Sequence, residues 1–331
     1  MLDHCDPPPE LMLDHLLETL LLPEPQARQA WERWRASINV DTLSYASQQL
    51  LPALIPDLPE WLEQDPASGI FKGIVRRIWS QNQLRLRLAV ELHSLLTEAA
   101  ARPIVAGPLA WSLRTRPPAI RVIPHLTFLV PRSNIRNAAD VLIHAGWEPR
   151  RDLPLDHALD WIDHVRFHRE NVQLNLHWRL VVVPPEDALA CERIFLSRVD
   201  CLQWNQHLLE TTSPETTMLH ILCGQRDGDL PWQADVALFG APGIDWTAFL
   251  KLARRFSPLA IERLRELHSL SHLAIPPLAV ERPGPLRRKC RFIWKAYRAH
   301  AYYRKKALTL PGLAAFLAMS FARKYVVHRT H

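Results

Sequence analysis

The side chains best suited to chemistry in this sequence lie on two predicted strands. Residues 119–130 and residues 172–180 each alternate polar and apolar side chains, which is the pattern of a half-buried strand. Side chains two positions apart on a strand share a face, so each strand presents a polar face that is built to meet something other than a core. The polar residues on these two faces are Arg121, His125, Thr127, Asn175, His177 and Arg179.

The neighbouring elements should bring the polar faces together. A shorter apolar run at residues 104–106 ends in Gly107 and leads into a predicted helix. Pro131 ends the strand predicted at residues 119–130, because proline cannot donate to a strand ladder. A helix closed by Gly146 is predicted next, at residues 132–145. We therefore expect Gly107 and both polar faces to converge on a single cleft.

The order of these motifs resembles an uncharacterised nucleotidyltransferase-like family of the polymerase-β superfamily. Members typically read Lys-Gly before a helix, then Arg-x-x-x-Asp-hydrophobic-Asp ending in Leu-Val, then acidic-hydrophobic-His-Trp. In this sequence the corresponding positions are held by Ala106-Gly107, by Arg121 with Leu129-Val130, and by residues 174–180, LNLHWRL. The resemblance extends from about residue 70 to about residue 270.

The resemblance also implies where the chain departs from an active enzyme. In active members three carboxylates hold two divalent cations, which align the attacking oxygen and neutralise the phosphate charge. The three carboxylate positions are occupied here by His125, Thr127 and Asn175. Magnesium prefers anionic oxygen ligands, so we expect no magnesium site and interpret the chain as a degenerate member. Without the resemblance, the same residues would be ordinary solvent-facing strand residues.

Three functions stay open at this point. The first is a pseudoenzyme that binds a nucleotide or another phosphate-bearing ligand through Gly107, Arg121, His177 and Arg179, with no metal between. The second is an active transferase that uses Mg²⁺ held by reassembled ligands. The third is an adaptor located by its basic tail. Because family members often accompany polysaccharide or peptide natural-product biosynthesis, the resemblance also implies a supporting role and a protein partner in such a pathway.

The predicted fold class is α+β, with a small mixed sheet between N- and C-terminal helical regions. The expected regions are an N-terminal helical region, an α/β core, a helical region packed on that core, and a helical tail, at residues 1–101, 102–210, 211–281 and 282–331. A long helix is predicted at residues 68–101, and a hairpin should pair residues 164–168 with residues 172–180 across Glu170-Asn171.

Charge is distributed unevenly along the 331 residues. Residues 282–331 contain 13 Lys or Arg and no Asp or Glu. We expect this tail to dock on acidic N-terminal helices, with attachment to an anionic membrane as the second use and nucleic-acid binding as the third. No signal peptide or apolar run of transmembrane length is expected, and the five cysteines favour reduced thiols in a cytoplasmic protein, with peripheral membrane attachment as the alternative.

Overall fold

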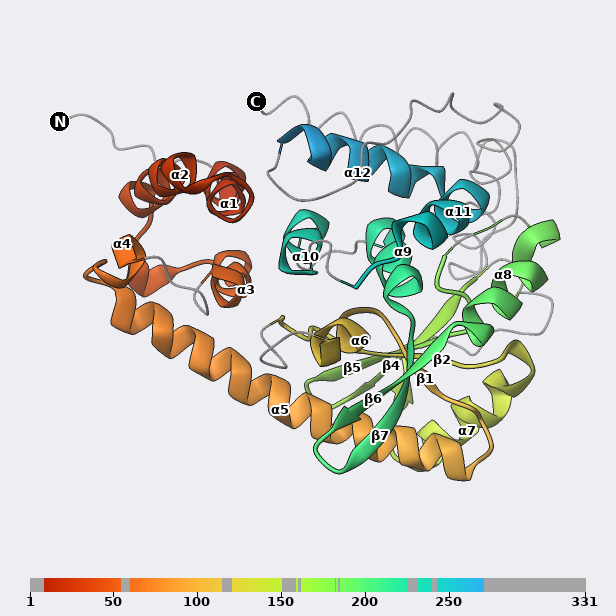
Figure 1. Ribbon diagram of the computed structural model, residues 1–331. Helices are drawn as coiled ribbons and strands as arrows, with labels where there is room; N and C mark the ends of the chain where they lie inside the picture. The colour runs from red at the N-terminus through yellow and green to blue at the C-terminus, as the bar shows by residue number, and fades with distance from the viewer. Residues whose placement is uncertain are drawn as a thin grey trace, which may run out of the picture.

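A mixed seven-stranded sheet forms the centre of the structure (Figure 1). The computed structural model describes residues 9–54, 60–114, 121–150, 159, 162–181, 183, 185–224, 231–239 and 243–270. The strand order is β3-β4-β5-β2-β1-β7-β6. The strands are β1 (Ile104–Val105), β2 (Leu126–Leu129), β3 (Glu148–Pro149), β4 (His164–Arg169), β5 (Val172–His177), β6 (Val199–Trp204) and β7 (His207–Thr212). Helices flank this sheet, so the predicted α+β class is confirmed.

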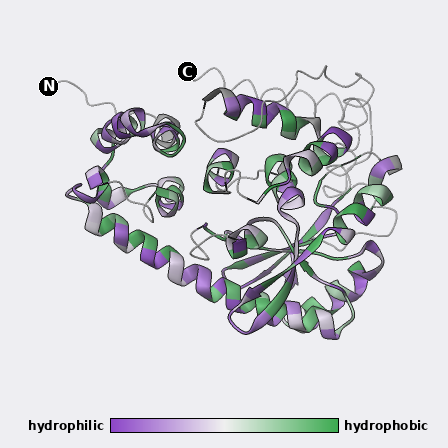
Figure 2. Cartoon of the chain, in the orientation of Figure 1, coloured by the Kyte–Doolittle hydropathy of each residue, from purple (hydrophilic) through white to green (hydrophobic). Residues whose placement is uncertain are grey.

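In the described part of the chain, four α-helices precede the sheet and a fifth joins them to it. They are α1 (Pro9–Leu21), α2 (Glu24–Ser37), α3 (Tyr45–Leu54), α4 (Glu60–Glu63) and the long α5 (Ser68–Glu98). The prediction of a long helix at residues 68–101 is therefore confirmed to within its last turn. Phe71, near the start of α5, packs with the N-terminal helices, whereas Leu92 and Leu96 pack with the sheet. Figure 1 shows α5 reaching from the N-terminal helices to the sheet, and Figure 2 shows hydrophobic and hydrophilic bands alternating along it.

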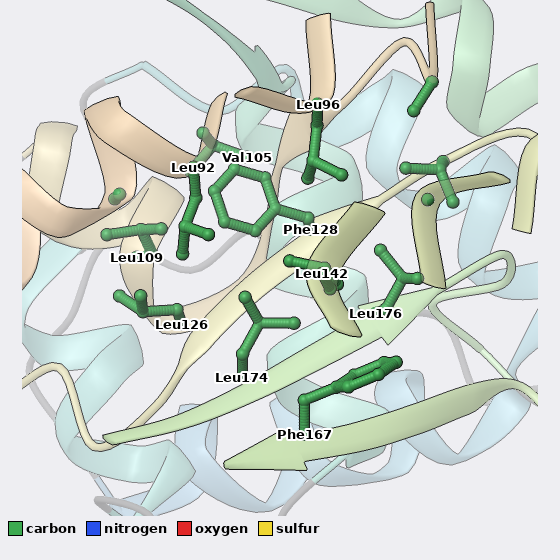
Figure 3. Packing of buried hydrophobic residues seen from close by; sticks show 14 of the residues in the cluster. Leu92, Leu96, Val105, Leu109, Leu126, Phe128, Leu142, Phe167, Leu174 and Leu176 are labelled. Atoms are coloured by element: carbon green, nitrogen blue, oxygen red, sulfur yellow. The ribbon is translucent and has the colours of Figure 1, made fainter. Parts of the chain in front are cut away.

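The remaining helices lie within or after the stretch of chain that forms the sheet. They are α6 (Gly107–Arg114), α7 (Ile135–His144), α8 (Pro185–Ser197), α9 (Pro214–Gly224), α10 (Trp232–Phe239), α11 (Trp246–Phe256) and α12 (Pro258–Leu270). Leu126 and Phe128 of β2 pack against α5 and α7 in one core, whereas Leu129 belongs to a second core with α9, α11 and α12. Figure 3 shows the first core, where Phe128, Leu174 and Phe167 from three strands gather on one face of the sheet.

The sheet has an additional hairpin, β6–β7, and a shorter β2 than predicted. The predicted hairpin is confirmed as β4 and β5, but the β6–β7 hairpin was not recognised as two separate strands. The strand predicted at residues 119–130 is wrong in its first half, because β2 begins only at Leu126. Pro124 has no N–H for a ladder, and the backbone before it is held by side chains instead. The predicted tail at residues 282–331 lies outside the described residues.

Asn82 of α5 supplies those side-chain bonds. Its amide donates to the Arg121 carbonyl at 2.9 Å and its oxygen accepts from the Ile123 N–H at 3.0 Å. Ser112 of α6 donates to the same Arg121 carbonyl at 2.8 Å. Asn82 is fully buried, so it replaces the strand partners that this segment lacks.

Within the part of the chain that the structure describes, no helix has both the length and the apolar character needed to span a bilayer. The division into four regions is not tested by these observations and stays a prediction.

The Asn82→Ala substitution is expected to lower the free energy of unfolding by about 1–3 kcal/mol, because it leaves the buried Ile123 N–H without its acceptor. Urea denaturation followed by circular dichroism measures this change. The exposed neighbour Gln81 provides the control, and Gln81→Ala should stay within about 0.5 kcal/mol of the parent. Equal stability of the two variants would contradict the role of Asn82.

Candidate functional site

The predicted motif positions meet on the face of the sheet opposite the first core. β2 and β5 are parallel neighbours, and their register places Thr127 beside Asn175 and Leu129 beside His177. The Ala106 N–H donates to the Thr127 carbonyl at 3.0 Å, which joins the start of α6 to β2. Thr127, Asn175 and His177 are all buried. The three motifs are thus adjacent, but their side chains lie inside the structure rather than in an open cleft.

Gly107 allows α6 to start at this point. Its φ of +57° lies in the left-handed region, where a Cβ is unfavourable. A Cβ on Gly107 would also lie 3.1 Å from His220 Cε1 and 3.6 Å from the Thr127 Cβ. Glycine is therefore needed both for the turn and for the close approach of α9.

The combination of a buried Gly-containing helix start, β2 and a parallel β5 fits the sequence resemblance. Residues 45–274 match the family model described as "Uncharacterised nucleotidyltransferase". The chain belongs to this family. No curated protein matched the chain. The family assignment covers α3 to α12, and thus includes the whole sheet.

The magnesium ions of an active nucleotidyltransferase do not fit this site. The implied ligand positions are His125, Thr127 and Asn175, and none of these side chains can supply an anionic oxygen. Thr127 and Asn175 are fully buried, and the Asn175 Oδ1 already accepts from the Gln173 amide at 3.0 Å. His125 lies just before β2 and is 9% exposed. A hard cation that demands octahedral oxygen coordination finds no charged ligand at these three positions.

Arg121 has a carboxylate partner that the motif positions did not indicate. Its Nε and Nη2 donate to the two carboxylate oxygens of Asp235 on α10, at 2.5 and 2.8 Å, and Nη1 donates to the Val122 carbonyl at 2.5 Å. Both side chains are 1% exposed. Burial raises the pKa of the Asp235 carboxyl, and the Arg121 guanidinium opposes that rise. The expectation that Arg121 binds the ligand stays a prediction, and the structure adds that its guanidinium pairs with Asp235.

Arg179 is engaged by backbone carbonyl groups. Its Nη2 donates to the carbonyls of Leu159 and Ile162 at 3.0 and 2.6 Å. A small pocket of about 70 Å³ lies beside it, just beyond the carboxyl ends of β2 and β5. The residues that line this pocket are Arg132, Leu159, Trp178, Arg179, Ala188, Leu189 and Glu192. Arg179 thus secures the chain segment before β4 and also borders a pocket.

A histidine cluster extends the polar face toward β4. The register pairs His164 with His177, and their rings stack with centroids 4.7 Å apart. The His177 ring also meets the His220 ring edge-on at 5.3 Å. The His177 Nδ1 donates to the Arg179 carbonyl at 3.1 Å, and the His164 Nδ1 donates to the Asp163 carboxylate at 2.7 Å.

Sequence reasoning did not find this cluster, although a signal was present. His168, four residues after His164 on the same strand, lies instead at the surface, with its Nε2 3.2 Å from a Glu148 carboxylate oxygen. The predicted turn at Glu170-Asn171 puts His164 and His177 equally far from the turn, and a hairpin pairs such positions. The position of His220 on α9 could not be obtained in this way, because it depends on helix packing.

The Asp235→Asn substitution should cost about 3–5 kcal/mol of unfolding free energy, because it leaves the buried Arg121 guanidinium without its counter-charge. Chemical denaturation measures the loss. The matched control is Asp200→Asn: Asp200 also pairs with an arginine, Arg114, at 2.8 Å, but its side chain is 42% exposed. That pair is expected to contribute only about 0–1 kcal/mol. Similar losses in both variants would contradict a special role for the buried pair.

The Gly107→Ala substitution should destabilise the protein by about 1–2 kcal/mol from backbone strain alone, since an L-residue is disfavoured at this φ. The added contact with His220 increases this cost. Gly73→Ala is the control, because Gly73 lies within α5 and a Cβ there meets nothing within 4 Å. It should instead stabilise the chain by about 0.5–1 kcal/mol. A melting temperature that shifts in the same direction for both variants would contradict the need for glycine at position 107.

Proposed function

We propose that this member of the nucleotidyltransferase family is a pseudoenzyme that binds a phosphate-bearing ligand, such as a nucleotide, without magnesium. The observation that carries the proposal is the side-by-side pair of Thr127 and Asn175 at two positions where the family would need carboxylates. A neutral hydroxyl and a neutral amide cannot hold the two cations that offset phosphate charge in the transferring enzyme.

We propose that the ligand binds in the pocket beside Arg179. It lies beyond the carboxyl ends of the parallel strands β2 and β5, and ligands commonly bind at that end of parallel strands. Arg132 and Arg179 both border it, and guanidinium groups suit phosphate recognition. Glu192 also borders the pocket, where its Oε1 accepts from the Arg132 N–H at 2.8 Å. We place the phosphate in this pocket, which Arg132 and Arg179 border together.

Two rival functions predict different behaviour. An active transferase would need reassembled metal ligands and would turn over nucleotide only with Mg²⁺ or Mn²⁺. An adaptor located by its tail would bind neither nucleotide nor metal in the folded core. A supporting role in a biosynthetic pathway, with a protein partner from it, is compatible with the pseudoenzyme and follows from the family resemblance alone.

Calorimetry on the metal-stripped full chain with ATP, GTP, CTP and UTP separates these functions. We expect binding of at least one nucleotide, an affinity that added Mg²⁺ or Mn²⁺ does not increase, and no nucleotide turnover. Arg132→Gln should weaken that binding by roughly tenfold, as expected for the loss of a charged hydrogen bond. The control is Arg136→Gln, on the exposed surface of α7. Metal-dependent turnover would establish the transferase instead, and absence of all nucleotide binding would leave the adaptor.

A further inference from the structure

We infer that Asp163, His164 and His177 form a binding site for a single borderline transition-metal ion of the Zn²⁺ type. The site lies at the edge of the polar sheet face and uses none of the three positions at which family members would hold magnesium. It does not depend on the proposed nucleotide binding, because all three ligands come from the chain itself.

The spacing of the ligand atoms carries the inference. One ligand atom from each of the three residues can be chosen so that all lie within 4.8 Å of one another. Ligands around a tetrahedral zinc ion stand about 3.3 Å apart, given metal–ligand bonds of about 2.0–2.1 Å. The rings of His164 and His177 are stacked, with 16° between their planes, so they must turn until their nitrogen lone pairs converge on the ion. Imidazole nitrogen together with one carboxylate suits zinc and its neighbours, whereas magnesium requires mainly oxygen.

The hydrogen bonds orient the ligands for this role. His177 Nδ1 donates to the Arg179 carbonyl at 3.1 Å, so the neutral ring presents its lone pair at Nε2. A backbone carbonyl at the second nitrogen is a common arrangement for a metal-bound histidine. His164 Nδ1 and Asp163 Oδ1 lie 2.7 Å apart and share one proton. In our proposal the ion takes the place of that proton at Nδ1 and the proton moves to Nε2, so the ring stays neutral and Nε2 no longer accepts from Arg166.

Access and coordination number are also suitable. The side chains of Asp163 and His164 are 20% and 19% exposed, so an ion can enter from solvent, while His177 is buried behind them. Three protein ligands leave one position of a tetrahedral ion for water or for an oxygen of a bound ligand. The bound ion would thus give the polar face a cation, at a place different from the lost magnesium site.

One neighbouring charge opposes the ion. The Arg166 Nε lies 3.4 Å from His164 Nε2, and a bound cation repels this guanidinium. Arg166 is half-buried on β4, and turning its side chain toward solvent would relieve this repulsion. The affinity should therefore be set by a balance between the three ligands and Arg166, and removal of Arg166 should tighten metal binding.

The test is a titration of the chelator-stripped full chain with Zn²⁺ in competition with a chromophoric chelator, without nucleotide. We expect one tightly bound Zn²⁺ per chain. His177→Asn keeps a donor for the Arg179 carbonyl but removes Nε2, and Asp163→Asn keeps an acceptor for His164 but removes the charge. Each should weaken binding by at least tenfold, whereas Arg166→Gln should strengthen it severalfold. His168→Asn, on the same strand but paired with Glu148, should leave the affinity unchanged.

The controls keep the inference falsifiable. The sequence contains 16 histidines and five cysteines, so zinc could bind elsewhere. Absence of stoichiometric binding, or unchanged affinity in Asp163→Asn, overturns the site. Circular dichroism checks that each variant folds, and if the buried His177→Asn does not, the half-exposed Asp163→Asn decides alone. Because no nucleotide is present, failure of zinc binding is separate from failure of the proposed function.

Discussion

The buried ion pair between Arg121 and Asp235 is the constraint around which the described parts of the chain are assembled. Two opposite charges removed from water are tolerated only when they neutralise each other with good geometry, and here the contact is bidentate. The Arg121 carbonyl is held by Asn82 of α5 and Ser112 of α6. On α10, Ala234 packs with the N-terminal helices and Val236 with the C-terminal ones. The ion pair therefore holds the entry to β2 where three groups of elements meet.

This constraint changes the meaning of the family motif. An arginine at the head of the metal-binding strand suggests a ligand contact when the strand is considered by itself. In the structure each of its three guanidinium nitrogens donates a hydrogen bond, two to Asp235 and one to the Val122 carbonyl. The same side chain thus stabilises the fold, and the candidate for anion recognition moves to the arginines that border the pocket beyond β5.

The polar face of the sheet differs in chemistry from that of a magnesium-dependent transferase. Hydroxyl, amide and imidazole groups occupy the face where anionic oxygens would be required, so the preference for hard cations is lost. Imidazole groups are concentrated one strand further along, where His164 and His177 stack and a single carboxylate, Asp163, adjoins them. Such a set of ligands favours softer ions. This ligand chemistry distinguishes the proposed zinc site from the magnesium site of an active transferase.

The sequence alone was sufficient for features that depend on local periodicity. The span of α5 follows from its helical spacing of apolar residues, and the β4–β5 hairpin follows from alternation around one turn. The positions that replace the carboxylates also follow from the sequence, once the motif order is recognised. Contacts between residues far apart in the chain were decided only by the tertiary structure. Asp235 lies more than a hundred residues from Arg121, and His220 reaches His177 from a separate helix. No local pattern encodes such contacts, because they result from how whole elements pack. The truncation of the predicted strand before Leu126 has the same origin, since Asn82 reaches it from α5.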